Sequence, residues 1–222
     1  SERPLYLPDV YQVSDRQRQS SPAPTRQSCG LPDGAFVFCS FNNNYKYTPE
    51  MFGVWMDILR RVPGSVLWLL ADNPWAQENL RREALVRGVS DDRLVFAPRA
   101  LPPDYLARYA VADLFLDAYP FNGGTTANDA LWMGLPVLTR AGQTFASRMA
   151  GALLTAAGLP ELVTDNPQAY ADKAVALAMS GADCRHLREQ LRRVRAEGAL
   201  FDTPRFVRNL EQAFRQLVAD AA

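Results

Sequence analysis

Histidine is almost absent from the chain, because His186 is the single one among 222 residues. This argues against a histidine-based zinc site or a Ser-His-Asp triad within it. The three cysteines, Cys29, Cys39 and Cys184, are odd in number and far apart, and no Cys-x-x-Cys or metal-ligand spacing occurs. Reduced thiols are the simplest interpretation, so we expect a cytoplasmic protein.

An excess of charge of either sign is also lacking, since 24 Lys and Arg residues balance 24 Asp and Glu residues. The chain as a whole therefore offers no electrostatic surface for nucleic acid or anionic lipid. No apolar run approaches membrane-spanning length, and no signal peptide opens the chain. We expect neither a nucleic acid nor a membrane as partner. The start, Ser1 to Pro4, looks like a cut inside a longer protein.

Composition divides the chain into two parts. Residues 1–34 contain the stretch SDRQRQSSPAPTRQSCGLPDG, which is rich in Pro, Ser, Gln and Arg and has little to bury. We interpret this part as a linker or the end of a preceding lobe. Residues 35–222 carry regular apolar patterns, and we expect them to form the folded domain with its C-terminal helices.

Short apolar runs alternate with helical patterns from residue 35 to about 165. The runs predict strands at 35–41, 66–71, 94–97, 114–117, 136–139 and 162–163. Helices are predicted at 49–62, 75–87, 104–112, 126–133, 147–157, 167–179, 183–196 and 204–220. The alternation indicates an α/β fold with a Rossmann-like, doubly wound parallel sheet. Its common strand order is 3-2-1-4-5-6.

A doubly wound sheet binds ligands where its strand order reverses, here between the first and fourth strands. The loops at that point read FNNNYKYTPE and YPFNGGTTAND. Gly123 and Gly124 let the backbone approach a ligand closely, and Thr125 and Thr126 begin a helix whose free amides favour an anion. With Lys46 on the opposite loop, the sequence predicts a cradle for a diphosphate.

Simpler interpretations exist for both loops. The asparagine-rich loop is compatible with a polar turn, because Asn tolerates left-handed backbone conformations. Thr126 and Asp129 have the spacing of a capping box, which would make them structural. A capped helix start can still hold a phosphate, so the two interpretations of the second loop are compatible.

Three long segments, in the right order and separation, carry a family resemblance: CSFNNNYKYTPEMFGVWMDILRRVPGSVLWLL, RLVFAPRA and LDAYPFNGGTTANDALWMGLPVLTRAGQTFASR. They resemble the carboxy-terminal lobe of the O-linked N-acetylglucosamine transferases, most closely the bacterial homologues, over about residues 35–215. The family has two Rossmann-like lobes in the GT-B arrangement, usually after tetratricopeptide repeats. The chain looks like the nucleotide-binding lobe alone.

The resemblance implies a UDP-N-acetylglucosamine donor, a protein Ser/Thr acceptor read by the other lobe and the repeats, and roles for matching residues. Lys46 is implied as the catalytic contact to the donor diphosphate, with Asn43 and the Gly123-Gly124 turn nearby. Thr125 and Thr126 are implied to bind phosphate oxygens and Asp129 the ribose hydroxyls. The uracil is implied to lie against Ala100 and Tyr105. Phe121 stands at a position that is a cysteine in the animal enzymes.

Other positions also depart from the animal enzymes. Those have histidine at the position of Gly124 and of Tyr105, and lysine at the position of Pro102. Some relatives transfer fucose from a GDP-sugar, so another nucleotide-sugar is an alternative donor. A non-catalytic interaction module is a second alternative. A nicotinamide-dependent oxidoreductase is a third, with Asp72 as its ribose ligand, but no Gly-x-Gly-x-x-Gly follows the first strand.

The implied reaction displaces UDP from the anomeric carbon with inversion. Donors aimed at the charge that develops on the leaving phosphate lower the barrier, which fits Lys46, Thr125 and Thr126. The chain has no Asp-x-Asp pair to clamp a metal-diphosphate, so we expect metal-free catalysis without a further cofactor. No general base is evident, and in the family such candidates lie in the other lobe. We therefore expect this chain alone to bind the donor but barely to catalyse.

Overall fold

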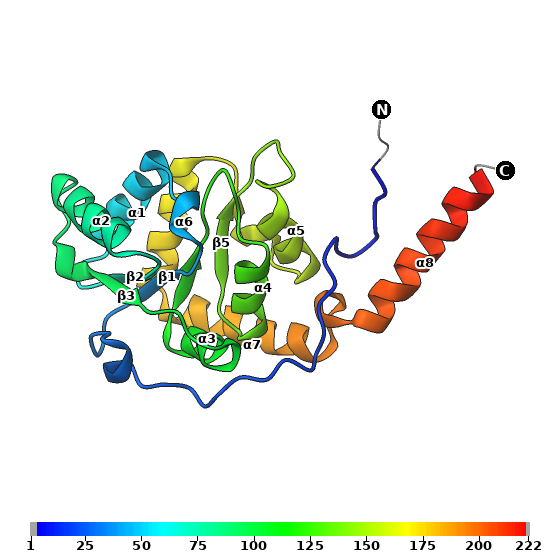
Figure 1. Cartoon of the computed structure of the whole chain (residues 1–222), viewed down its shortest axis with the longest axis horizontal. Helices are drawn as coiled ribbons and strands as arrows, with labels where there is room; N and C mark the ends of the chain where they lie inside the picture. Colours follow the sequence, from blue (N-terminus) through cyan, green and yellow to red (C-terminus); the bar gives the residue numbers. More distant parts are fainter. Residues whose placement is uncertain (1–3, 221–222) are drawn as a thin grey trace.

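A parallel sheet forms the centre of the computed structural model, which describes residues 4–220 (Figure 1). Within these residues it has six strands in the order β3-β2-β1-β4-β5-β6. The strands are β1 (Val37–Ser40), β2 (Val66–Leu70), β3 (Leu94–Ala97), β4 (Leu114–Leu116), β5 (Val137–Arg140) and β6 (Val163–Thr164). Both the fold class and the strand order predicted from the sequence are confirmed, so the order reverses between β1 and β4.

One helix follows each of the six strands, and two further helices complete the part of the chain that the structure describes (Figure 1). They are α1 (Pro49–Arg61), α2 (Pro74–Val86), α3 (Pro102–Arg108), α4 (Thr125–Trp132), α5 (Met149–Ala156), α6 (Pro167–Met179), α7 (Gly181–Glu197) and α8 (Thr203–Asp220). The start of α1 follows the expected local rule, because the Thr48 hydroxyl accepts a hydrogen bond from the Met51 amide and Pro49 takes the first helical position. Among residues 4–220, no helix has both the length and the apolar character needed to cross a bilayer.

Large aromatic and apolar side chains fill the space between sheet and helices. Trp55, Met56 and Trp68 are fully buried, and Trp132 nearly so. The Phe41 ring, at the end of β1, makes an edge contact with the Trp68 ring at 5.0 Å between centroids. This packing fixes the strand ends at which the site is built.

The chain before β1 lies along the outside of the lobe without joining the sheet (Figure 1). We call residues 9–21 the strap. Arg205, on α8, pairs with Asp9 through two hydrogen bonds of 2.7 Å. Ser14 is buried, and its hydroxyl accepts a hydrogen bond of 2.9 Å from the Asn128 side chain on α4. Although this segment has the composition of a linker, it is anchored to the lobe.

The last helix, α8, projects away from the lobe beyond these anchors (Figure 1). Phe206 at its start is partly buried against the core. Phe214, Leu217 and Val218, further along, are exposed. The apolar side chains of this helix therefore pack on the lobe at one end only.

Candidate functional site

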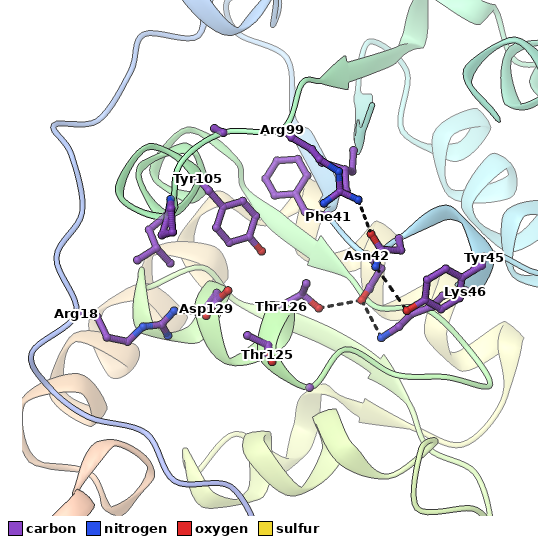
Figure 2. Close-up of a pocket in the computed structure, with 16 residues that line it drawn as sticks. Arg18, Phe41, Asn42, Tyr45, Lys46, Arg99, Tyr105, Thr125, Thr126 and Asp129 are labelled. Carbon is purple, nitrogen blue, oxygen red and sulfur yellow. Dashed lines mark hydrogen bonds and ion pairs between the residues drawn. The ribbon is translucent and has the colours of Figure 1, made fainter. Parts of the chain in front are cut away.

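A pocket of about 610 Å³ lies at the point where the strand order reverses, as the sequence predicts (Figure 2). Its volume is that of an ordinary small-molecule site. The pocket is lined by Arg18, Phe41, Asn42, Asn43, Tyr45, Lys46, Leu70, Arg99, Ala100, Pro102, Tyr105, Leu106, Gly124, Thr125, Thr126 and Asp129.

Eight of the ten residues singled out from the sequence line this pocket. They are Asn43, Lys46, Ala100, Tyr105, Gly124, Thr125, Thr126 and Asp129. The other two lie beside it. Gly123 is buried, and its amide donates to Asp117 Oδ1 at 2.7 Å. The centroid of the Phe121 ring lies 4.2 Å from Lys46 Nζ, so the ring contacts the cation, and Phe121 is not among the residues that line the pocket.

Lys46 comes from a short 3-10 turn, Asn44–Lys46, directly after β1. Its Nζ donates to the Asn122 carbonyl at 3.0 Å and to Asn42 Oδ1 at 3.4 Å. Burial lowers the pKa of Lys46, while the nearby Asp117 charge raises it. Within residues 4–220, Lys46 makes no salt bridge with a carboxylate. A half-buried cation held by neutral oxygens is well suited to meet an anionic ligand.

Asn42 joins the two loops of the site, a role that the sequence does not reveal. Its Oδ1 accepts from the Thr126 hydroxyl at 2.8 Å as well as from Lys46 (Figure 2). Its Nδ2 donates to Asp117 Oδ1 at 3.4 Å. The side chain is buried, so this amide fixes the spacing between the cation on one loop and the helix start on the other.

Asp117 is a fully buried carboxylate directly after β4, and sequence reasoning did not single it out as a site residue. Its Oδ1 accepts from the amides of Ala118 at 2.9 Å and Gly123 at 2.7 Å, and its Oδ2 accepts from the Thr139 hydroxyl at 2.7 Å. Burial raises the pKa of Asp117 to about 6, against the effect of these hydrogen bonds. By holding the Gly123 amide, Asp117 shapes the turn that leads into α4.

The start of α4 is not a capping box, so that interpretation is wrong. Gly124 precedes the helix, and no side chain caps it. The Thr126 hydroxyl bonds to Asn42 instead, and the Asp129 carboxylate pairs with Arg18. Both side chains are thus engaged in the pocket wall, and the first amides of α4 have no side-chain acceptor.

The far wall of the pocket combines Asp129 with tyrosine rings. Burial raises the pKa of Asp129, while its hydrogen bond with Arg18 lowers it. The hydroxyls of Tyr105 and Tyr109 lie 2.5 Å apart, and burial raises the pKa of Tyr105. Ala100 and Pro102 complete a surface that is mostly apolar apart from the carboxylate and the phenols.

Arg99 is a further pocket residue that the sequence did not indicate. It follows β3, and its guanidinium donates to Asn43 Oδ1 at 3.2 Å and pairs with Asp72. Asp72 is the carboxylate that a nicotinamide site would need for its ribose, and here it is engaged by Arg99. Across residues 4–220, no group of three or more His, Cys, Asp or Glu side chains is arranged to hold a metal ion.

Comparisons with known proteins agree with this geometry. A family model described as glycosyl transferase family 41 matches residues 12–210. The chain is 36% identical, over 96% of its length, to the probable UDP-N-acetylglucosamine–peptide N-acetylglucosaminyltransferase SEC of Arabidopsis thaliana. It is also 36% identical, over 87% of its length, to the UDP-N-acetylglucosamine–peptide N-acetylglucosaminyltransferase of Caenorhabditis elegans. These matches span 23% and 17% of the two relatives.

A solved structure gives the same relationship in three dimensions. The structure of a mutant O-GlcNAc transferase from Thermobaculum terrenum superimposes with a TM-score of 0.88 at 34% identity. The match covers 97% of this chain and 41% of that chain. The chain therefore corresponds to less than half of each of these three proteins.

Proposed function

This chain belongs to glycosyl transferase family 41, and from that premise we propose that it is the donor-binding lobe of a protein O-glycosyltransferase. The donor would be UDP-N-acetylglucosamine, and the acceptors would be serine or threonine hydroxyls of proteins. The observation that carries the proposal is the pocket between β1 and β4, where a cation and a helix start face each other beside a buried carboxylate.

The diphosphate would lie between Lys46 and the start of α4. Lys46 Nζ is bonded to neutral oxygens, so an anion can add to its coordination without displacing a carboxylate. The amides of Thr125 and Thr126 carry the positive end of the helix dipole. The Thr125 hydroxyl adds a further donor, while the Thr126 hydroxyl gives its proton to Asn42. Asn42 holds this arrangement together before the ligand arrives, which is what preorganised charge stabilisation requires.

The nucleoside would lie against the other wall. A ribose presents two neighbouring hydroxyls, and the Asp129 carboxylate can accept hydrogen bonds from them. Tyr105 and Ala100 would face the base, with the tyrosine ring in place of the histidine of the animal enzymes. Because Gly124 has no side chain where those enzymes carry histidine, the sugar must be recognised partly by other groups.

The proposed chemistry is displacement of UDP from the anomeric carbon by an acceptor hydroxyl, with inversion. Lys46 and the donors at the start of α4 would stabilise the charge that grows on the leaving β-phosphate oxygen. We expect no metal ion in this role. The base that activates the acceptor hydroxyl would come from the other lobe, and the tetratricopeptide repeats with that lobe would select the acceptor. A cytoplasmic location is part of the same proposal.

A competition assay on the complete protein tests the proposal. Calorimetric titration would compare UDP and GDP, followed by their N-acetylglucosamine and fucose conjugates, at equal ionic strength. We expect UDP and UDP-N-acetylglucosamine to bind more tightly than the guanosine compounds. Tighter GDP and GDP-fucose binding would establish the alternative donor, and the absence of binding by any nucleotide would favour a non-catalytic interaction module.

A further inference from the structure

The strap crosses the nucleoside end of the pocket and is attached on both sides of it. On one side, Asn128 of α4 donates to the Ser14 hydroxyl at 2.9 Å. On the other side, the Ser21 hydroxyl donates to Asp104 Oδ1 at 2.6 Å, at the start of α3. Arg18 lies between these two attachments and lines the pocket. A segment outside the sheet thus forms part of the wall that faces the nucleoside.

Arg18 pairs with Asp129, and the side chains of this ion pair are mostly shielded from water. The Asp129 side chain is 5% exposed and the Arg18 side chain 24% exposed, so water screens the pair only weakly. A buried carboxylate without a cation is stabilised in its protonated form. The other groups that face Asp129 are the phenols of Tyr105 and Tyr109, which carry no positive charge.

The geometry leaves room for a ligand on the same carboxylate. Arg18 bonds to Oδ1 of Asp129. An ionised carboxylate has about four acceptor sites on its two oxygens, so Oδ2 can still accept from hydroxyls. Figure 2 shows Arg18 reaching Asp129 from the strap, on the side away from Asn42 and Lys46. The arginine therefore approaches the carboxylate from the strap side of the pocket, and the side toward Lys46 is left for a ligand.

We propose that Arg18 is a positioning residue for nucleotide recognition, which holds the Asp129 carboxylate oriented for the two hydroxyls of a ribose. The proposal rests on the proposed function, in which Asp129 binds the ribose. It assigns a part of donor recognition to the strap, a segment that lies outside the sheet.

The test uses the complete protein with three variants. Arg18→Met keeps the apolar stem and removes the charge, and Arg18→Lys restores a cation. The matched control is Arg16→Met, because Arg16 also anchors the strap, through the Gly198 carbonyl at 2.9 Å, but does not line the pocket. Binding of UDP and of 2′,3′-dideoxy-UDP would be measured by calorimetry from pH 5 to pH 8, with the melting temperature of each variant.

We expect Arg18→Met to weaken UDP binding about tenfold at pH 7, a loss in the range of a hydrogen bond to a charged group. The loss should grow as the pH falls. Without the Arg18 charge the pKa of Asp129 is higher, so the carboxylate of the variant takes up a proton at a higher pH than that of the wild type. The dideoxy compound should bind the wild type and Arg18→Met equally. Arg18→Lys should recover part of the affinity, and Arg16→Met should bind UDP as the wild type does.

Three results would overturn the inference. An equal loss for UDP and the dideoxy compound would mean that Arg18 acts on another part of the ligand or only on the fold. The same loss in Arg16→Met would mean that strap anchoring in general is responsible, and wild-type affinity in Arg18→Met would show that the arginine is dispensable. Failure of the proposed function looks different, because the wild type itself would then bind no UDP or would not distinguish it from the dideoxy compound.

Discussion

Replacing Asp117 by asparagine removes one buried charge and leaves almost all of its hydrogen bonds in place. The side-chain oxygen of asparagine can accept from the amides of Ala118 and Gly123, as Oδ1 does now. The new amide group can donate to the Thr139 hydroxyl, which then turns from donor to acceptor. Asp117→Asn is therefore close to an isosteric test of what the charge alone contributes.

The expected magnitude follows from the pKa. Burial raises the pKa of Asp117 from 3.8 to about 6. Because an acid with a raised pKa binds its proton more tightly in the folded state, its contribution to the free energy of unfolding falls as the pH rises from about 4 to above 6. At about 1.4 kcal/mol for each pH unit between the two pKa values, the loss is about 3 kcal/mol. Asparagine does not titrate, so the variant should avoid this loss.

The assay is urea unfolding of the 222-residue chain between pH 4 and pH 7.5. Subtracting the wild-type value from that of Asp117→Asn cancels the other titrating groups, so the difference should rise with pH by up to about 3 kcal/mol. Asp117→Ala is the control, because it leaves the Gly123 amide and the Thr139 hydroxyl without their acceptor and should destabilise at every pH. A difference that stays flat or falls with pH would refute the reasoning, since the hydrogen bonds and Lys46 would then outweigh burial.

Four further predictions concern the site in the complete protein. Lys46→Met should lower turnover about a hundredfold or more while changing UDP affinity less and the melting temperature little; near-normal turnover in a folded variant would show that the diphosphate is held elsewhere. Asp129→Ala should weaken UDP binding, measured by calorimetry, more than it lowers the melting temperature; the reverse result would make Asp129 purely structural. In Gly123→Ala the new Cβ would lie 2.6 Å from Thr126 Oγ1, so the turn must shift; we expect a loss of about 1–3 kcal/mol in urea unfolding and weaker UDP binding, and a variant with wild-type stability and affinity would contradict this close approach. UDP should raise the melting temperature equally with and without EDTA, and a strict need for a divalent metal would refute metal-free binding.

The sheet could be predicted from the sequence because its signals are local. Each buried strand is a short apolar run between turn residues, and the doubly wound order follows from the handedness of the crossovers. The two loops at the reversal point, and with them Lys46, Thr125 and Thr126, could then be placed without knowing any side-chain contact. The observed strand boundaries differ from the predicted ones by one or two residues, as at β5, which begins at Val137 rather than at residue 136.

The missed residues depend on contacts that no local pattern carries. Asn42 is one of three consecutive asparagines, and only the packed loop decides that it bonds to Thr126. Asp117 ends an apolar strand, where a carboxylate facing the core and one facing solvent look alike in sequence. Arg18 lies in a stretch with the composition of a linker, and its partner Asp129 is 111 residues away. The capping-box interpretation failed because α4 already begins at Thr125, so Thr126 lies inside the helix and not at its N-cap, and Asp129 is engaged by Arg18.

The strap also has a consequence for the time course of folding. Its contacts join residues far apart in the chain: 196 residues separate Asp9 from Arg205, and 189 separate Ser14 from Thr203. On a ribosome that adds about 5–20 residues per second, the strap leaves the exit tunnel about 10–40 s before α8 does. The sheet and its first helices pair over much shorter stretches and can form in that interval. The contacts of Asp9 and Ser14 with α8 are therefore a late step in synthesis of this lobe, after Arg18 can already pair with Asp129.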